Sequence, residues 1–249
     1  MKLEKNKKKI IYGTICFTIL AALLVVFGIN SKDVDLSSKS NDDDTPITSS
    51  SNDNKTIYKA YYELYLGKDY SQKQEINNEA DYIAIVTIDS LSASNWDTLN
   101  KEYVSPYTKG TAKVVKTLKG ELPTTINYRR LGAEISYNEW IKGDVDPKKL
   151  EKVTTIQENK KNVVVDSRMS HDIHLEVGKT YLVFMKQYSC CNIDNEYTII
   201  AFEHGTRELQ QQTENSVLST QNIGSLKVKD NVTGNWVNLS DVVNMGETK

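Results

Sequence analysis

Two adjacent cysteines, Cys190 and Cys191, lie in the segment "QYSCCNIDNEY" of a chain that has three cysteines in all. Four chemical states fit such a pair: a vicinal disulfide, two free thiols, a disulfide to another molecule, and a metal site. A vicinal disulfide is strained, because adjacent Cα atoms lie about 3.8 Å apart, below the usual range of about 4.4–6.8 Å. A metal site needs more ligands than two neighbouring thiols supply. We favour the vicinal disulfide and keep the other three states open.

Three histidines, His171, His174 and His204, are the candidates for metal binding or acid–base chemistry. His171 and His174 are three residues apart. At this spacing two side chains lie on one face of a helix but point to opposite sides of a strand. Neither the His-x-His nor the His-Glu-x-x-His pattern of metal sites is present. We therefore expect surface histidines, no metal and no cofactor. An envelope metal-dependent enzyme that uses His171, His174 or His204 is kept as an alternative function.

No Gly-x-Ser-x-Gly elbow occurs in the chain, and the carboxylates are scattered along a charged stretch, so no hydrolase is indicated. The better candidates are binding residues. Arg129 and Arg130 alternate across a predicted strand, so that one of them could face a barrel mouth and bind an anion. Trp96 and Tyr103, which we expect in a loop over residues 94–108, could be aromatic anchors of an interface.

The first nine residues, "MKLEKNKKK", hold five lysines and one glutamate, and residues 10–29 carry no charge. An apolar run of about 20 residues spans about 30 Å, the thickness of the hydrocarbon core of a bilayer. Lysines ahead of such a run keep the N-terminus in the cytoplasm. We therefore predict a cytoplasmic segment over residues 1–9 and a single-pass membrane anchor over residues 10–29, with a cleaved signal peptide as the alternative. The C-terminal domain is then extracellular.

Residues 30–55 are rich in Ser, Asp and Asn and nearly free of apolar side chains, which is typical of a disordered tether. Five lysines and one glutamate give the N-terminal segment a net charge of +4. Because the whole chain carries −2, the rest of it carries −6. This acidic balance argues against nucleic acid as a partner, because its binding needs clustered Lys and Arg. We expect an envelope protein or a small ligand as the partner, and membrane contact through the N-terminal helix.

Residues 56–249 are long enough for one domain with its own core. The spacing of Ile57, Ala60, Tyr61 and Leu64 predicts a helix over residues 56–67, and residues 133–177 are expected to be loop with one or two helical turns. Alternating β-branched and aromatic residues predict strands at 80–94, 108–123, 124–132, 179–189 and 196–205, followed by a small hairpin over Asn231–Gly234 and a short helix. Short strands with turns marked by glycine indicate a small closed or partly closed barrel.

Four segments, "ADYIAIVTI", "VVKTLKG", "VGKTYLVFM" and "YTIIAFEHG", follow one another in an order that resembles a known fold. It is the OB-fold, netrin-module-like domain of tissue inhibitors of metalloproteinases and of bacterial surface proteins, and the resemblance covers residues 79–205. It implies a five-stranded, partly closed OB-type barrel without catalytic activity. Those inhibitors bind the zinc of a protease through a cysteine at their mature N-terminus. This domain has no cysteine near its start, so protease inhibition is not implied.

The sequence thus predicts an all-β domain with minor α content over residues 56–249, with its barrel core at 79–205. We expect it to be a non-catalytic binding module at the cell membrane. In OB-type barrels the groove across the barrel face and the neighbouring loops carry the ligand. The expected ligand-binding residues are Trp96, Tyr103, Arg129 and Arg130. A structural surface protein that pairs with another envelope protein is a further alternative.

Overall fold

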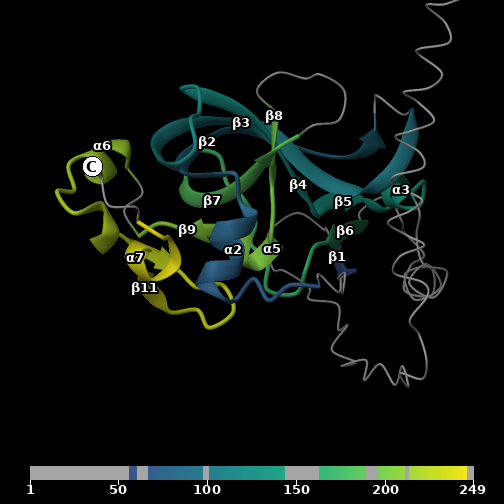
Figure 1. Cartoon of the computed structure of the whole chain (residues 1–249). Coiled ribbons are helices and arrows are strands. Elements are labelled where there is room, and N and C mark those ends of the chain that lie inside the picture. Colours follow the sequence, from purple (N-terminus) through teal and green to yellow (C-terminus); the bar gives the residue numbers. More distant parts are fainter. Residues whose placement is uncertain are drawn as a thin grey trace, which may run out of the picture. The chain divides into compact units, whose positions relative to one another are not determined.

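The computed structural model describes residues 56–60, 67–97, 101–143, 163–188, 196–210 and 213–245, all of which belong to one compact unit, Asp44–Lys249. These residues are mostly β-structure, as predicted (Figure 1). The expected cytoplasmic segment, membrane anchor and tether, residues 1–55, lie outside the described ranges. Within those ranges, no helix has the length and apolar character needed to cross a membrane.

Five strands curl into a ring-like sheet. They are β2 (Tyr82–Asp97), β3 (Glu102–Lys119), β4 (Thr125–Leu131), β7 (Thr180–Gln187) and β8 (Glu196–Ile199). The strand order is β2-β3-β4-β8-β7, and β7 also pairs with β2, which joins the two ends of the sheet. The β4–β8 pair is parallel and the other pairs of the ring are antiparallel. A short strand, β9 (Thr206–Glu208), pairs with the first part of β7, while β8 pairs with the last part of the same strand.

The long strands β2 and β3 bend to make this ring possible, and their curvature is plain in Figure 1. The register between them shifts at several points, one of which lies between Ile88 and Ser90. Such bulges increase the local twist of a strand pair. Gly110 pairs with Leu91, just beyond this point, and a Cβ atom at position 110 would be only 1.9 Å from the carbonyl oxygen of Ser90. The bend therefore needs a glycine at position 110.

The two faces of the ring belong to two hydrophobic cores. On β2 the alternation is direct, since Ala84 and Val86 belong to the inner core, whereas Ile83 and Ile85 belong to the outer one. All five strands contribute to the inner core, which includes Ala112, Ile126, Tyr181, Met185, Tyr197 and Ile199. Short elements from both ends of the domain cover the outer core: α2 (Lys73–Glu79), α6 (Glu214–Leu218), η2 (Ile223–Ser225), β10 (Lys227–Lys229), β11 (Trp236–Asn238) and α7 (Leu239–Val242).

The predicted C-terminal hairpin and short helix are present as β10–β11 and α7. The predicted strand 196–205 ends earlier, because residues 202–205 form a helical turn, α5 (Phe202–Gly205). These differences are local, and the strands of the ring lie where the sequence places them.

Two expectations are wrong in the described residues. The start of the helix expected over 56–67 is instead a strand, β1 (Thr56–Lys59), because its β-branched and aromatic residues pair in parallel with β6 (Val163–Ser167). The expected loop 133–177 contains β5 (Ala133–Ser136), α3 (Tyr137–Trp140) and β6, and the three strands form a sheet of order β1-β6-β5. A third apolar cluster, with Tyr58, Tyr137, Trp140 and Val165, stabilises this sheet.

Candidate functional site

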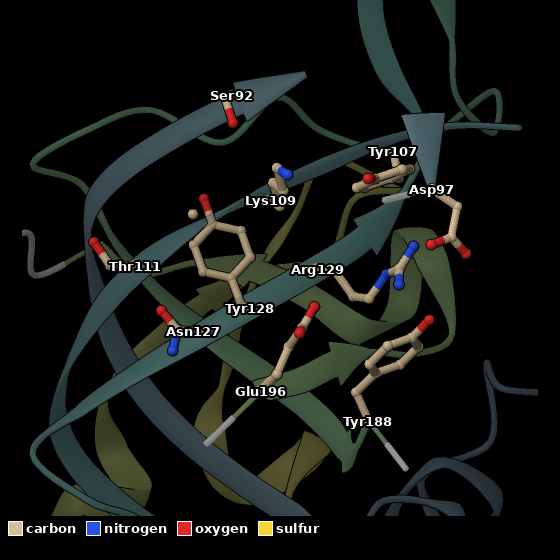
Figure 2. Close-up of a pocket in the computed structure, with 11 residues that line it drawn as sticks. Ser92, Asp97, Tyr107, Lys109, Thr111, Asn127, Tyr128, Arg129, Tyr188 and Glu196 are labelled. Carbon is tan, nitrogen blue, oxygen red and sulfur yellow. The ribbon is translucent and has the colours of Figure 1, made fainter. Parts of the chain in front are cut away.

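A cavity of about 340 Å³ opens on the face of the ring formed by β3 and β4 (Figure 2). Arg129 lies between two buried residues of β4, Tyr128 and Arg130, so its side chain is on the opposite face of the strand. The lining residues come from β2, β3, β4 and the two ends of the β7–β8 connection. They are Ser92, Asp97, Tyr107, Lys109, Gly110, Thr111, Asn127, Tyr128, Arg129, Tyr188 and Glu196.

The guanidinium of Arg129 is held between two tyrosine rings (Figure 2). Its Cζ atom lies 4.5 Å from the ring centre of Tyr107 and 4.3 Å from that of Tyr188. Cation–π contacts of this kind do not use the N–H groups as hydrogen-bond donors, so these groups remain available to other partners. Within the described part of the chain, Arg129 makes no ion pair and no side-chain hydrogen bond. The cavity thus contains an oriented cation whose donors are available to a ligand.

The cavity is polar and its formal charges are balanced. Lys109 and Arg129 are positive, and Asp97 and Glu196 are negative. The remaining groups include the hydroxyls of Ser92 and Thr111 and the amide of Asn127, which can both donate and accept hydrogen bonds. Such a lining fits a ligand that carries several hydroxyl groups and no more than a small net charge.

Hydrogen bonds fix two of the tyrosines at the cavity. The hydroxyl of Tyr107 donates to the carbonyl oxygen of Trp96 at 2.9 Å, and that of Tyr128 donates to the carbonyl oxygen of Ser90 at 3.1 Å. Burial raises the pKa of Tyr128 far above its usual value, so its hydroxyl stays protonated and remains a donor at neutral pH. These two wall residues are therefore oriented by the barrel, with no need for a ligand to order them.

Trp96 and Tyr103, two of the expected binding residues, lie beside this cavity on the strands themselves. The expected loop 94–108 is thus largely strand, and Trp96 and Tyr103 are partners across β2 and β3. Their rings meet edge to face, with centroids 4.8 Å apart. They are 38% and 39% exposed, so the pair is open to solvent rather than part of a core. Tyr107 connects this pair to the Arg129 cavity through its bond to the Trp96 carbonyl.

Arg130, the fourth expected binding residue, is buried and is not part of the cavity. It forms an ion pair with Asp172 through Nη2 and donates from Nη1 to the carbonyl oxygen of Ile173 at 2.8 Å. Burial and the nearby charge of Arg168 lower the pKa of Arg130 to about 9, which still leaves it charged at neutral pH. The anion that this arginine binds is the carboxylate of Asp172, within the domain itself.

A second cavity, of about 520 Å³, contains the one cluster of potential metal ligands found in the described ranges: Glu134, Asp166 and His174. The Nε2 atom of His174 lies 3.2 Å from Oε1 of Glu134 and 3.8 Å from Oδ2 of Asp166. Burial and the charge of Arg168 lower the pKa of His174, so its ring is neutral near pH 7.

A guanidinium already fills the centre of this cluster. Arg168 donates from Nε to Oδ1 of Asp166 at 2.6 Å, and its Nη2 group contacts both Oδ2 of Asp166 and Nε2 of His174. A metal ion at the same carboxylate would lie beside this cation and would have to displace it. The residues therefore do not fit a metal, and we derive no metal chemistry from them.

In the part of the chain that the structure describes, the three histidines do not form one cluster. His171 is exposed, His174 belongs to the cluster around Arg168, and Nε2 of His204 lies 3.7 Å from Oε1 of Glu203. Cys190 and Cys191 lie outside the described ranges. In sequence they are part of the connection between Tyr188 and Glu196, two residues that line the first cavity.

Four companions of Arg129 were not predicted as site residues: Tyr107, Lys109, Asn127 and Tyr188. A signal for two of them was present, because Lys109 and Asn127 lie on the predicted strands 108–123 and 124–132, and residues 127 and 129 share one face of their strand. Tyr107 fell in the expected loop 94–108, where alternation was not applied. The contact of Tyr188 with Arg129 depends on the pairing of β4 with β8, in which each residue of β4 pairs with the residue 69 positions further along the chain.

Comparison with family models, with curated proteins and with solved structures gave no match for this chain. Conclusions about function therefore depend on the chemistry of the chain's own residues.

Proposed function

We propose that this chain is a membrane-tethered, extracytoplasmic binding module on a five-stranded OB-type barrel, and that it acts by binding rather than by catalysis. The ring of five strands supports the OB-type description, as does the resemblance to netrin-module-like domains. In OB-type barrels, ligands lie on the second and third strands and on the loops beside them. In this chain those strands are β3 and β4, which carry Lys109, Thr111, Asn127 and Arg129.

The observation that carries the proposal is the clamp on Arg129. An arginine held by two tyrosine rings, with its edge donors unused by the described residues, is preorganised for an oxyanion. Preorganisation lowers the entropy cost of binding, because the side chain is already ordered. The cavity also joins both ends of the β7–β8 connection to the barrel face, as expected for a ligand site of this fold.

The lining supports binding over catalysis. None of the described residues that line the first cavity is a histidine or a cysteine. Among the described lining residues, the hydroxyl groups therefore have no imidazole beside them as a general base, and the carboxylates of Asp97 and Glu196 are the bases that the lining offers. The lysines before residue 10 and the uncharged run 10–29 support a location outside the cytoplasm, anchored in the cell membrane.

The two alternatives have less support. A metal-dependent enzyme using His171, His174 or His204 would need a metal at the cluster of Glu134, Asp166 and His174. There the guanidinium of Arg168 already binds the carboxylate of Asp166. A structural surface protein that pairs with another envelope protein would use a broad surface and would not need the oriented cation in the cavity. The experiment below distinguishes both from a ligand-binding module.

The test is a binding screen with the full chain, purified in detergent. The array carries oligosaccharides, carboxylated and phosphorylated small molecules, and peptides, and it is probed with the wild type and with Arg129→Gln. We expect one class of compound to bind the wild type, to lose most binding with the variant, and to be recovered chemically unchanged. The matched control is Lys179→Gln, an exposed lysine outside the cavity that pairs with Glu176.

Equal binding by the wild type and Arg129→Gln would show that the cavity is not the binding site. Conversion of the bound compound into a product would favour an enzyme. Far-ultraviolet circular dichroism of each variant checks that the fold is intact.

A further inference from the structure

From the geometry we infer the class of ligand, resting on the proposed function: an acidic glycan that places the carboxylate of one sugar on Arg129 and a neighbouring sugar on Trp96 and Tyr103. Two features of the molecule support this class of ligand: the polar cavity and the exposed aromatic pair beside it. Each feature suits a different part of such a glycan.

The first step concerns the charged group. The edge of a guanidinium presents parallel N–H donors that match the two oxygens of a carboxylate. The rings of Tyr107 and Tyr188 hold the Arg129 guanidinium in place, so its N–H donors are already ordered for an anion. Because Asp97 and Glu196 already offset Arg129 and Lys109, one added negative charge is better tolerated than the two of a phosphate monoester.

The second step concerns the rest of the ligand. Sugar hydroxyls both donate and accept hydrogen bonds. The carboxylates of Asp97 and Glu196 accept, the hydroxyl of Ser92 does both, and the amide of Asn127 does both. The cavity volume of about 340 Å³ is near the lower end of the range for small-molecule sites, about 300–1,000 Å³. It therefore suits a single sugar unit rather than a folded partner.

The third step concerns the length of the ligand. One face of a pyranose ring carries mainly C–H groups, and such a face stacks on the negatively polarised face of an aromatic ring. Trp96 and Tyr103 offer partly exposed rings next to the cavity, since Tyr107 contacts both Arg129 and the backbone of Trp96. A ligand of at least two linked sugars can therefore use the cavity and the aromatic pair together.

The fourth step concerns charge density. The folded part of the chain, residues 56–249, carries a net charge of only −3, and the cavity itself is balanced, so a highly charged glycan gains no long-range attraction. A glycan whose acidic sugars alternate with neutral ones supplies one carboxylate for Arg129 and a neutral sugar for the aromatic pair. Hyaluronan, in which glucuronate alternates with N-acetylglucosamine, is a suitable probe of this class.

The test is calorimetric titration of the full chain in detergent with a hyaluronan hexasaccharide and with the same oligosaccharide after reduction of its carboxyl groups to alcohols. We expect the reduced ligand to bind about 10- to 100-fold more weakly, as for the loss of charge-assisted hydrogen bonds. Arg129→Gln should weaken binding of the acidic ligand by a similar factor and leave the reduced ligand unaffected. Arg129→Lys should also weaken it, because an ammonium has no planar fork.

The aromatic pair has its own readout. Trp96→Ala should weaken the hexasaccharide about 2- to 10-fold, in the range of aromatic contacts, and leave binding of free glucuronate unchanged. Tyr103→Ala repeats the measurement on the partner ring, in case the first variant is unstable. Lys179→Gln should bind every ligand as the wild type does.

The inference is overturned if acidic and reduced oligosaccharides bind equally, or if hyaluronan, oligogalacturonate and oligosialic acid all fail to bind. If inorganic phosphate or an acidic peptide binds instead in an Arg129-dependent way, the binding function stands and the glycan class is wrong. If no probe distinguishes the wild type from Arg129→Gln, both proposals are wrong.

Discussion

Arg129 and Arg130 are neighbours in sequence and have opposite environments, which follows directly from strand alternation. Arg130 points to the buried side of β4 and is neutralised by Asp172. Arg129 points to the open side, where two aromatic rings hold it without neutralising it. The first arrangement stabilises the fold, and the second leaves a charge available for a ligand.

The buried pair gives a stability prediction. Arg130→Met should lower the free energy of unfolding by about 3–5 kcal/mol, because it leaves the carboxylate of Asp172 buried without its partner. The double change Arg130→Met with Asp172→Leu should recover much of this loss, since no charge is then left buried. Urea unfolding measures both effects.

A matched control is Lys113→Met, which breaks the solvent-exposed pair between Lys113 and Glu214. It should cost no more than about 1 kcal/mol. Equal losses in the free energy of unfolding for Arg130→Met and Lys113→Met would show that the buried pair stabilises the fold no more than the exposed pair does.

Asp230 gives a prediction about pH. Burial raises the pKa of its carboxyl, but hydrogen bonds from the Thr233 amide and from Arg207 outweigh burial and lower the pKa from 3.8 to about 2. A carboxyl whose pKa is lower in the folded state stabilises the fold above its unfolded pKa, and the effect is lost as pH falls. We therefore expect roughly 2 kcal/mol of stability to disappear between about pH 4 and pH 2.

Asp230→Asn should flatten this part of the stability curve and lower the stability at pH 7, as measured by urea unfolding over the pH range. Glu214→Gln, on an exposed carboxylate, is the control. An unchanged slope in Asp230→Asn would contradict the assignment.

At the scale of elements, the β2–β3 hairpin builds both the barrel and the binding face, and Gly110 is its most constrained position. Gly110→Ala would place a Cβ atom against the carbonyl oxygen of Ser90, so the bend must open or the strands must separate. We expect a loss of about 2 kcal/mol or more in the free energy of unfolding. Gly178→Ala, at a position with open space but a positive φ, separates backbone strain from this clash.

If Gly110→Ala were as stable as the wild type, the close approach of β3 to Ser90 would not exist in solution. A larger loss for Gly178→Ala than for Gly110→Ala would show that the clash at Gly110 costs less than a positive φ at Gly178.

The strands of the ring were predictable from sequence because their alternation is local and each strand is bounded by turn residues. Arg129 was predictable as a candidate because alternation beside Arg130 places the two on opposite faces. The strand at Thr56–Lys59 was not, because its apolar spacing also fits a helix and only pairing with β6, more than 100 residues away, decides the outcome. The clamp on Arg129 has the same limit, since Tyr188 reaches it only through tertiary pairing.

At the scale of the whole molecule, we propose that the binding domain lies outside the cell and is joined to a membrane anchor by residues 30–55, which the sequence predicts to be a tether. The topology makes a prediction of its own. Protease added to intact cells should cleave the chain beyond residue 30 and leave a small fragment with the N-terminus. Protection of the domain in intact cells, with cleavage only after lysis, would show that it lies in the cytoplasm.

The most direct test of the binding claim follows the side chains of the cavity themselves. In the full chain labelled at arginine and tryptophan, addition of the hyaluronan hexasaccharide should shift the nuclear magnetic resonance signals of Arg129 Nε–H and of the Trp96 indole. Trp140, which is buried, and Trp236, which lies on β11 outside the cavity lining, should give unchanged indole signals. An Arg129 signal that stays in place at saturating ligand would contradict the account.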